Sequence, residues 1–524
     1  MQKNKKKQIV IWWAGPAWLT FAYEILSRSD DFDVIILERF DRVWGISTTI
    51  EHHGNKMDIW WHRFFSKSKR VMDRRFKMMP LQWSNSYDYK QIWINSKIQI
   101  GGPDPDKEDV VMLSRRRLSR IFWNNKFFDY PLTISFSTIR NLWWLETIKI
   151  WLSYISSKFQ KFDTTNLEWF YKSRFGTELY NKFFKNYTRN VWWVDPKDIP
   201  SEWWAQRVKW LSLTSAVWDY FKKLFTSKQT TETETSLIWS FYYPKYGPWQ
   251  MRQIVSDKVS WLWGNIIKWA EIVWSRIEDN KIVSIKYMKN SVEHTLEPDY
   301  FISTLAIKDL LKTMTWADKN IVLLSSKLMY RDFVTVWVLV DKLAISNDGR
   351  FASINNCIPD NWIYVHDDRL KVGRIQIFNN RSPYMLWDTR YMWIWLEYFC
   401  DEDTDKIYNS SDGNIIDIAK KELTLLWLTD TSTDYIDFKV VRYDKTYPSY
   451  FGEWYKNFAK IRSYVDGISN LFLIWRNGMH RYNNQDHSML CGMELADMLL
   501  SGNIDKSTLR EINTERSYHE EQDK

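Results

Sequence analysis

The sequence predicts an α/β fold: a parallel β–α–β unit at the start of the chain, a helical insertion after it, and a mixed sheet in the later half. Three observations support this. A β-branched strand at residues 9–11 leads into an apolar helix pattern at residues 16–27, and a buried strand follows at residues 33–38. Long amphipathic patterns dominate from about residue 114 to 223. Short alternating patterns return at residues 265–304.

The turn between the first strand and the first helix carries the most informative motif. A Rossmann-like dinucleotide-binding unit has the turn G-x-G-x-x-G, whose glycines allow the tight turn, the approach of a pyrophosphate and close helix packing. Gly15 supplies the middle glycine, but Trp13 and Trp18 occupy the other two positions. An indole there fills the space that the phosphate or the neighbouring strand needs. Glu38 ends the second strand, where an acidic residue binds a ribose; an ordinary strand-end carboxylate is the alternative.

Composition accounts for tryptophan in a glycine turn. The chain has 16 Gly and 34 Trp, whereas a typical chain of this length has about 7% Gly, roughly 37 residues. Tryptophan recurs where the backbone favours glycine, at Trp44, Trp60, Trp61, Trp193, Trp249 and Trp475. We therefore expect many of these residues to be glycine in the natural protein, through a UGA codon that some bacterial lineages read as glycine. A chain that is genuinely rich in aromatic residues is the alternative.

Charge and cysteine content narrow the function classes. The 73 basic and 64 acidic residues give a net charge of +9, and they are dispersed, so no nucleic-acid partner is expected. Three distant cysteines, Cys357, Cys400 and Cys491, argue against a disulfide framework and a zinc site, and they fit a reducing, cytoplasmic setting. Glu24 follows the apolar run at residues 9–23, which argues against a signal peptide or a transmembrane segment.

The later segments are predicted in chain order. A polar loop is expected at residues 226–236, between the helical insertion and the short strands. Strands are expected around residues 333–341, 361–378 and 391–400, where they build a substrate-side sheet. The end of the chain is predicted as one more strand, a loop and a closing helix.

With glycine at the tryptophan positions, the start of the chain resembles a superfamily of FAD-dependent enzymes. After Glu38 the chain reads DRVWG and then DIWWHRFF. The motif residues are Arg42, Trp44, Gly45, Trp60, Trp61 and His62. Read with glycine pairs, they are similar to the superfamily of amine oxidases, protoporphyrinogen oxidases and UDP-galactopyranose mutases. The resemblance implies a Rossmann-like FAD-binding domain of the glutathione-reductase type, a mixed-sheet substrate domain and FAD as the cofactor.

Later motifs are most similar to the UDP-galactopyranose mutase branch, and the similarity spans nearly the whole chain. FFKNYTRNVWWVDP with AQRVKWLSL resembles the segment that delivers Arg207 to a nucleotide-sugar diphosphate. VGRIQIFNNRSPYM resembles the strand that supplies a second arginine, Arg374. Two guanidiniums can clamp a diphosphate bidentately. Trp192 and Trp362 stand where this branch has an aromatic residue, so we expect them to be authentic.

The closing motif RYNNQDHSML extends the same similarity. It implies that Tyr482 faces the substrate and that Asn484, Gln485 and Ser488 lie at the flavin end. Trp475, which precedes this motif, is also assigned to the cofactor site. The start of the final helix can direct backbone N–H groups toward the flavin pyrimidine. The resemblance thus assigns catalytic roles to His62, Arg207, Arg374 and Tyr482. Each residue also has a purely structural alternative. His62 could be a core histidine and Arg207 a surface residue. Arg374 could be a half-exposed strand residue, and Tyr482 could pack the loop.

Three functions remain open at this level. The mutase resemblance implies isomerisation of a nucleotide-sugar, UDP-galactose in the family's own reaction, through N5 of reduced FAD. An FAD-dependent oxidoreductase of the amine oxidase or protoporphyrinogen oxidase type is the alternative. An inactive flavin-binding or scaffolding protein is the third, if the printed tryptophans are authentic. A small UDP-sugar is the expected partner, and the oligomeric state, a homo-oligomer included, is left open.

The predicted domain order follows from these segments. Five consecutive parts are expected: 1–70 as the first part of the FAD-binding domain, 71–225 as the substrate side with the helical insertion, 226–305 as the second FAD-binding part, 306–440 as the substrate-domain sheet, and 441–524 as the C-terminal FAD-binding part.

Overall fold

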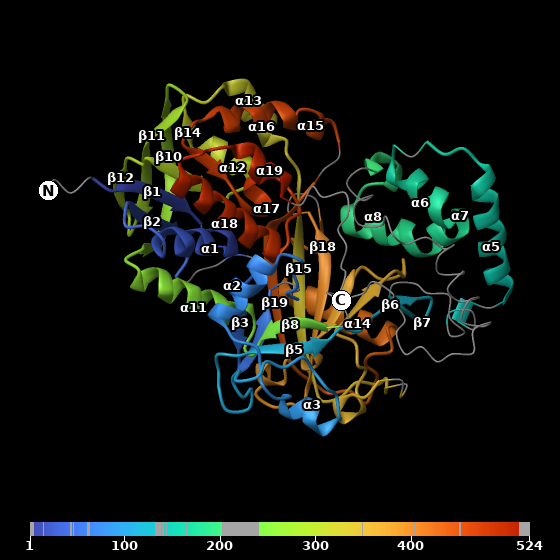
Figure 1. Cartoon of the computed structure of the whole chain (residues 1–524). Coiled ribbons are helices and arrows are strands. Elements are labelled where there is room, and N and C mark those ends of the chain that lie inside the picture. The colour runs from blue at the N-terminus through green and yellow to red at the C-terminus, as the bar shows by residue number, and fades with distance from the viewer. Residues whose placement is uncertain are drawn as a thin grey trace.

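A computed structural model shows three parts, which Figure 1 presents as a Rossmann-like body, a central sheet and a helical lobe. The described residues are 5–13, 15–41, 45, 47–59, 63–130, 138, 141–142, 144–163, 165–201, 240–347, 349, 351–401, 405–449 and 452–512. Within them, no helix combines the length and the apolar character that crossing a membrane requires.

The Rossmann-like body is built on a parallel sheet with the order β20-β13-β1-β2-β9. Its strands are β1 (Lys7–Trp12), β2 (Phe32–Glu38), β9 (Asn265–Lys268), β13 (Tyr300–Ser303) and β20 (Leu471–Leu473). Helices α1 (Pro16–Leu26) and α18 (Gln485–Ser501) pack against each other over this sheet. Segments from both ends and from the middle of the chain therefore contribute strands to one sheet.

Smaller elements surround this sheet. An antiparallel group has the order β12-β11-β10-β14. Its strands are β10 (Ala270–Glu278), β11 (Lys281–Lys289), β12 (Val292–Leu296) and β14 (Met314–Thr315). The neighbouring helices are α11 (Pro248–Trp261), α12 (Ile307–Lys312), α13 (Lys319–Ser326), α15 (Glu453–Lys456), α16 (Phe458–Gly467), α17 (Trp475–Gly478) and α19 (Lys506–Glu511). The strands predicted at residues 265–304 are confirmed.

The central sheet has seven strands in the order β19-β15-β18-β17-β16-β6-β7. They are β6 (Ser119–Trp123), β7 (Lys126–Asp129), β15 (Tyr330–Val340), β16 (Trp362–Val365), β17 (Arg374–Ile377), β18 (Met392–Cys400) and β19 (Tyr435–Pro448). Every residue of β15 and β18 is buried, because α14 (Asp412–Leu425) and a hydrophobic cluster cover one face and the Rossmann-like body abuts the other. Only β16 and β6 pair in parallel, so the predicted mixed sheet is confirmed.

Two small pairings and two helices join the body to the central sheet. The pairings are β3 (Thr49–His52) with β4 (Asn55–Asp58) and β5 (Met112–Arg116) with β8 (Ser240–Pro244). The helices are α2 (Lys69–Met78) and α3 (Tyr87–Gln91). In Figure 1 these elements lie below the Rossmann-like body.

The helical lobe at the right of Figure 1 begins later than the sequence predicts. Its elements are α5 (Trp144–Phe159), α6 (Leu167–Phe175), α7 (Thr177–Leu179), a π-helix (Tyr180–Lys185) and α8 (Asn186–Trp192). The expectation of helix from residue 114 is wrong for its first part, because β5 ends there and β6 and β7 follow. Short strands with mixed polar residues carry little periodicity, so the long helices downstream dominated the pattern.

Candidate functional site

The structure describes part of the predicted site. Six of the predicted residues lie outside the described ranges: Arg42, Trp44, Trp60, Trp61, His62 and Arg207. The other predicted residues fall into two groups. One group surrounds the start of α1, and the other surrounds Arg374 at the junction of the three parts of the molecule.

The turn before α1 has the backbone of a glycine turn with indoles attached. Trp13 has φ 72° and Trp475 has φ 70°, a left-handed conformation that favours glycine. Gly15 is the N-cap of α1, and a Cβ built on it would lie 4.0 Å from Cε2 of Trp475. Trp18 is fully buried in α1, and its indole N–H has no partner among the described residues. As printed, this turn does not fit a pyrophosphate, because the Trp475 indole lies over Gly15 at the helix start.

The other cofactor-side residues lie at the end of β2 and at the start of α18. Glu38 is buried and accepts a hydrogen bond from the backbone N–H of Phe40, at 3.1 Å. Asn484 caps α18 reciprocally with His487, so its side chain satisfies one of the N–H groups predicted to face a flavin. Ser488 donates to the carbonyl of Asn484 at 2.9 Å. Gln485, by contrast, contacts Ser47 and Arg75.

A small, partly open pocket lies between α1, α2, α11 and the start of α18. Gln485 donates to the hydroxyl of Ser47 at 3.1 Å and accepts from Arg75 at 3.4 Å, so it links the segment after Gly45 to α2. Burial lowers the pKa of Arg75 to about 9 and that of Arg252 to about 10. The Nε atoms of both arginines lack partners within the described ranges. Two buried guanidiniums, each with an Nε donor that lacks a partner among the described residues, fit an anionic group, unlike the blocked turn beside them.

Arg374 lies at the first position of β17, directly opposite Glu397 of β18. Its Nη1 is 3.3 Å from Oε2 of Glu397, and its Nε donates to the hydroxyl of Tyr187 at 3.3 Å. Nη1 also lies 3.5 Å from the hydroxyl of Tyr447, on β19. The guanidinium is buried rather than half-exposed, which corrects the structural alternative considered for it. Side chains from β18, β19 and α8 therefore surround the Arg374 guanidinium.

Tyr482 closes this cluster from the Rossmann-like side. Its ring stacks on Tyr447 with centroids 5.6 Å apart and an interplanar angle of 16°. The Arg476 guanidinium lies 4.5 Å from the Tyr482 ring centroid, and its Nη1 and Nη2 donate to the carbonyls of Thr446 and Asn483. We call Tyr187, Arg374, Glu397, Tyr447, Arg476 and Tyr482 the arginine–tyrosine junction. It joins α8, the central sheet and the C-terminal segment.

Electrostatics keep the junction cationic at Arg374 and protonated at its phenols. Burial disfavours the Arg374 charge, but the nearby Tyr187 and Glu397 groups raise its pKa well above the ordinary value. Burial raises the pKa of Tyr187 to about 12 and that of Tyr447 well above its usual range. Burial also raises the pKa of Glu397, an effect that Arg374 opposes. The junction can therefore offer the fixed Arg374 cation and neutral O–H donors to an anion.

Sequence reasoning missed four junction residues and one buried acid. Tyr187 lies inside a quoted motif, Glu397 lies in a predicted strand and Arg476 directly follows Trp475, but none of these signals assigned a role to them. Tyr447 lies in a segment for which no element was predicted. Asp58 ends the β3–β4 hairpin, accepts hydrogen bonds from Tyr243 and Thr49, and lies 3.7 Å from Arg381. Burial raises its pKa to about 7 despite Arg381. Because this buried acid lies two residues before the predicted flavin-side motif at 60–62, the β3–β4 hairpin positions the start of that motif.

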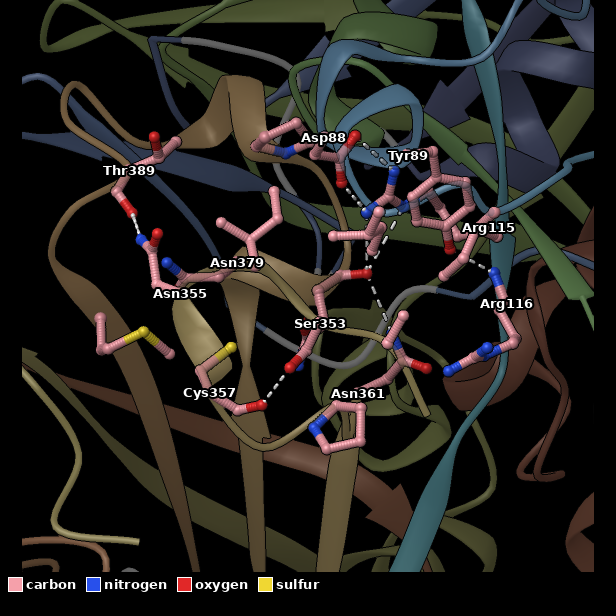
Figure 2. Close-up of a pocket in the computed structure, with 18 residues that line it drawn as sticks. Asp88, Tyr89, Arg115, Arg116, Ser353, Asn355, Cys357, Asn361, Asn379 and Thr389 are labelled. Carbon is pink, nitrogen blue, oxygen red and sulfur yellow. Dashed lines mark hydrogen bonds and ion pairs between the residues drawn. The ribbon is translucent and has the colours of Figure 1, made fainter. Parts of the chain in front are cut away.

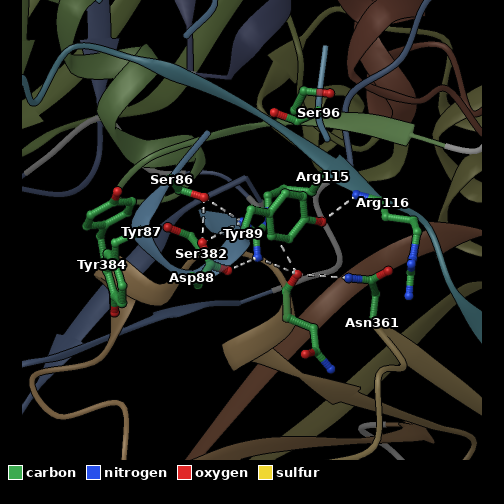
Figure 3. A network of polar contacts seen from close by, with 12 residues as sticks. Ser86, Tyr87, Asp88, Tyr89, Ser96, Arg115, Arg116, Asn361, Ser382 and Tyr384 are labelled. Carbon is green, nitrogen blue, oxygen red and sulfur yellow. Dashed lines mark hydrogen bonds and ion pairs between the residues drawn. The ribbon is translucent and has the colours of Figure 1, made fainter. Parts of the chain in front are cut away.

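A second small cavity lies away from both groups, between α3, β5 and the loop before β16 (Figure 2). None of the predicted site residues lines it. Its polar groups already have partners: Asn355 donates to the carbonyl of Thr389 at 3.3 Å, and Arg115 forms a two-pronged ion pair with Asp88 (Figure 3). We therefore assign this cavity a structural role.

Comparisons with known proteins place the fold. No protein-family model and no curated protein sequence matches the chain. A crystal structure of reduced UDP-galactopyranose mutase matches with a TM-score of 0.75 and 17% identity, over 98% of this chain and 100% of that one. A protein predicted to be a protoporphyrinogen oxidase, from Exiguobacterium, matches with a TM-score of 0.65 and 11% identity, over 96% and 100%. A redesigned putrescine oxidase matches with a TM-score of 0.58 and 10% identity, over 95% of this chain and 100% of that one.

These similarities show the fold, and they do so over almost the whole length of each chain. The three proteins come from the mutase, protoporphyrinogen oxidase and amine oxidase groups that the motifs resemble. The α/β class and the Rossmann-like arrangement are confirmed. The glutathione-reductase subtype stays a prediction.

Proposed function

We propose that this chain is an FAD-dependent enzyme that isomerises a nucleotide-sugar in the manner of UDP-galactopyranose mutase. The observation that carries the proposal is the arginine–tyrosine junction, because a buried, permanently charged guanidinium surrounded by phenols suits a diphosphate. The fold similarity to the mutase over 98% of the chain supports the same choice. An apolar pocket without arginine would favour an amine or a porphyrinogen.

The residues take separate tasks in this proposal. Arg374 binds the diphosphate, and Tyr187, Tyr447 and Tyr482 supply hydroxyl groups and aromatic surface beside it. Arg207 and His62 keep the roles that the mutase resemblance implies. Bound FAD would supply the nucleophilic chemistry at its N5 atom. Glu397 balances the Arg374 charge when no diphosphate is present, which lowers the cost of keeping a buried cation.

The test is a direct assay of isomerisation. Protein with glycine at positions 13, 18, 44, 60, 61 and 475 is reduced and incubated with UDP-galactose and, separately, with UDP-galactofuranose. We expect chromatography to show interconversion of the two sugars. Bound flavin without interconversion, together with oxidation of an amine or a porphyrinogen, would instead support the alternative oxidoreductase function.

We also propose that the natural protein has glycine at many of the printed tryptophan positions. Eight described tryptophans have φ between 54° and 73°; they are Trp13, Trp93, Trp193, Trp263, Trp269, Trp316, Trp427 and Trp475. The left-handed region is a rare place for a bulky residue. Trp193 directly follows α8, and Trp263 and Trp427 each follow the capping residue of α11 and α14, positions where glycine commonly ends a helix. Trp192, in contrast, is buried inside α8.

Peptide masses from the natural protein test this assignment. We expect the peptide that spans residues 8–28 to have glycine at positions 13 and 18, and the peptides with Trp192 and Trp362 to retain tryptophan. Each replaced residue lowers the peptide mass by the difference between an indole side chain and a hydrogen atom. Tryptophan at position 13 in the natural peptide would contradict the proposal.

A further inference from the structure

A cluster of two histidines and one aspartate joins the β3–β4 hairpin to the central sheet. His52 ends β3, His53 begins the hairpin turn, and Asp437 belongs to β19. Nδ1 of His53 is 2.7 Å from Oδ2 of Asp437, and Nε2 of His52 is 3.2 Å from the same oxygen. One nitrogen from each ring and one carboxylate oxygen all lie within 4.8 Å of one another. Residues far apart in the chain thus present three metal-ligand atoms to one point.

The local backbone places the two rings side by side. His52 pairs with Asn55, so His53 and Gly54 form a two-residue turn, with φ 47° and 79°. These values are those of a type I′ turn, in which asparagine usually occupies the first position. His53 instead takes that left-handed position, and its ring centroid lies 4.0 Å from that of His52. The His53 side chain is 74% exposed, so an ion can reach it from solvent.

The chemistry of this donor set selects a class of ion. We propose that His52, His53 and Asp437 bind a divalent transition-metal ion such as Zn²⁺, with solvent completing the coordination. Imidazole and carboxylate are common zinc ligands, at about 2.0–2.2 Å from the ion, which places tetrahedral ligand atoms about 3.3–3.6 Å apart. The 3.2 Å between His52 Nε2 and Asp437 Oδ2 is near this range, and the 2.7 Å hydrogen bond between His53 Nδ1 and Asp437 Oδ2 would lengthen as the ion replaces its proton. The three distant cysteines led us to expect no zinc site in this chain; the proposed site differs from that expectation, because its ligands are histidine and aspartate rather than thiolate.

Binding would fasten two parts of the molecule together. The hairpin continues through β4 and Asp58 toward residues 60–62, and β19 continues to Tyr447 in the arginine–tyrosine junction. An ion held by both elements would fix the hairpin against the sheet and stabilise the native chain, because it binds the folded state only. This inference is independent of the proposed activity.

Calorimetric titration with Zn²⁺ tests the site on the full-length chain after chelator treatment. We expect saturable binding at one site, weakened about tenfold or more in both His53→Ala and Asp437→Asn. His294→Ala is the matched control, because His294 is exposed on β12 and stacks on Tyr287 without a carboxylate; it should bind as the unaltered chain does. Co²⁺ gives a second readout, through its visible absorption bands when imidazole ligands bind.

Thermal unfolding separates binding from loss of fold. Zn²⁺ is expected to raise the Tm of the unaltered chain and of the His294 variant, and to leave the Tm of the other two variants unchanged. Far-UV circular dichroism reports whether each variant is folded before the titration. The proposal is overturned if the unaltered chain shows no saturable binding, or if the folded His53 and Asp437 variants bind Zn²⁺ as tightly as the control.

Discussion

Glycine at positions 13, 18 and 475 is expected to convert a flavin-free protein into one that purifies yellow with stoichiometric FAD. In the printed chain, the Trp475 indole covers Gly15, and Trp13 holds a left-handed conformation at the start of the turn. Removing the three indoles opens the approach to the N-terminus of α1, where backbone N–H groups can bind a pyrophosphate. Charged hydrogen bonds contribute about 1.5–3 kcal/mol each, so we expect FAD to bind at least about a hundredfold more tightly.

A matched substitution distinguishes this effect from a general gain in stability. Trp93 also has positive φ, but its side chain is 92% exposed and lies outside the turn. Trp93→Gly should relieve the same kind of backbone strain without changing flavin content. Absorbance of the purified proteins and titration of the flavin-free proteins with FAD measure the outcome. Equal FAD affinity for the tryptophan and glycine forms, when both are folded, would contradict the expectation.

The first β–α–β unit could be predicted because its evidence is local. Ile9, Val10 and Ile11 form a continuous apolar run, Pro16 marks the helix start, and Glu38 ends a second buried strand, so each step has its own signal. The observed β1, α1 and β2 differ from the predicted bounds by a residue or two. Helix starts and buried strands depend mainly on residues close by in the sequence, so they can be predicted from a single sequence.

The arginine–tyrosine junction could not be predicted in full because its contacts are non-local. Arg374 was identified through a motif, yet its partner Glu397 appears in the sequence as one residue of a fully buried strand. Only the antiparallel register of β17 and β18 places the two side chains opposite each other. Tyr447 lies near the end of β19, a strand that the sequence analysis did not predict, and Arg476 lies in the short helix α17 after β20. Register and sheet order, rather than composition, decide which side chains meet.

Arg374→Met is expected to abolish interconversion of UDP-galactose and UDP-galactofuranose while the protein keeps its flavin. The substitution removes the buried cation that we assign to the diphosphate, and kcat/KM should fall at least about a hundredfold, since charged hydrogen bonds contribute about 1.5–3 kcal/mol each. It also leaves Glu397 buried beside three phenols, and breaking a buried ion pair in this way costs about 3–5 kcal/mol of the free energy of unfolding. Loss of activity alone would therefore not distinguish binding from stability.

The double variant Arg374→Met/Glu397→Gln separates these two effects. It removes both charges, so it should recover most of the free energy of unfolding, measured by denaturant titration, because no unpaired charge remains buried. Activity should stay lost, since the diphosphate still has no guanidinium at this position. Arg374→Lys is the companion, as an ammonium keeps the charge but not the bidentate geometry, and it should raise KM more than it lowers kcat. If activity instead returned together with stability in the double variant, Arg374 would have a structural role, and the diphosphate would have to bind elsewhere.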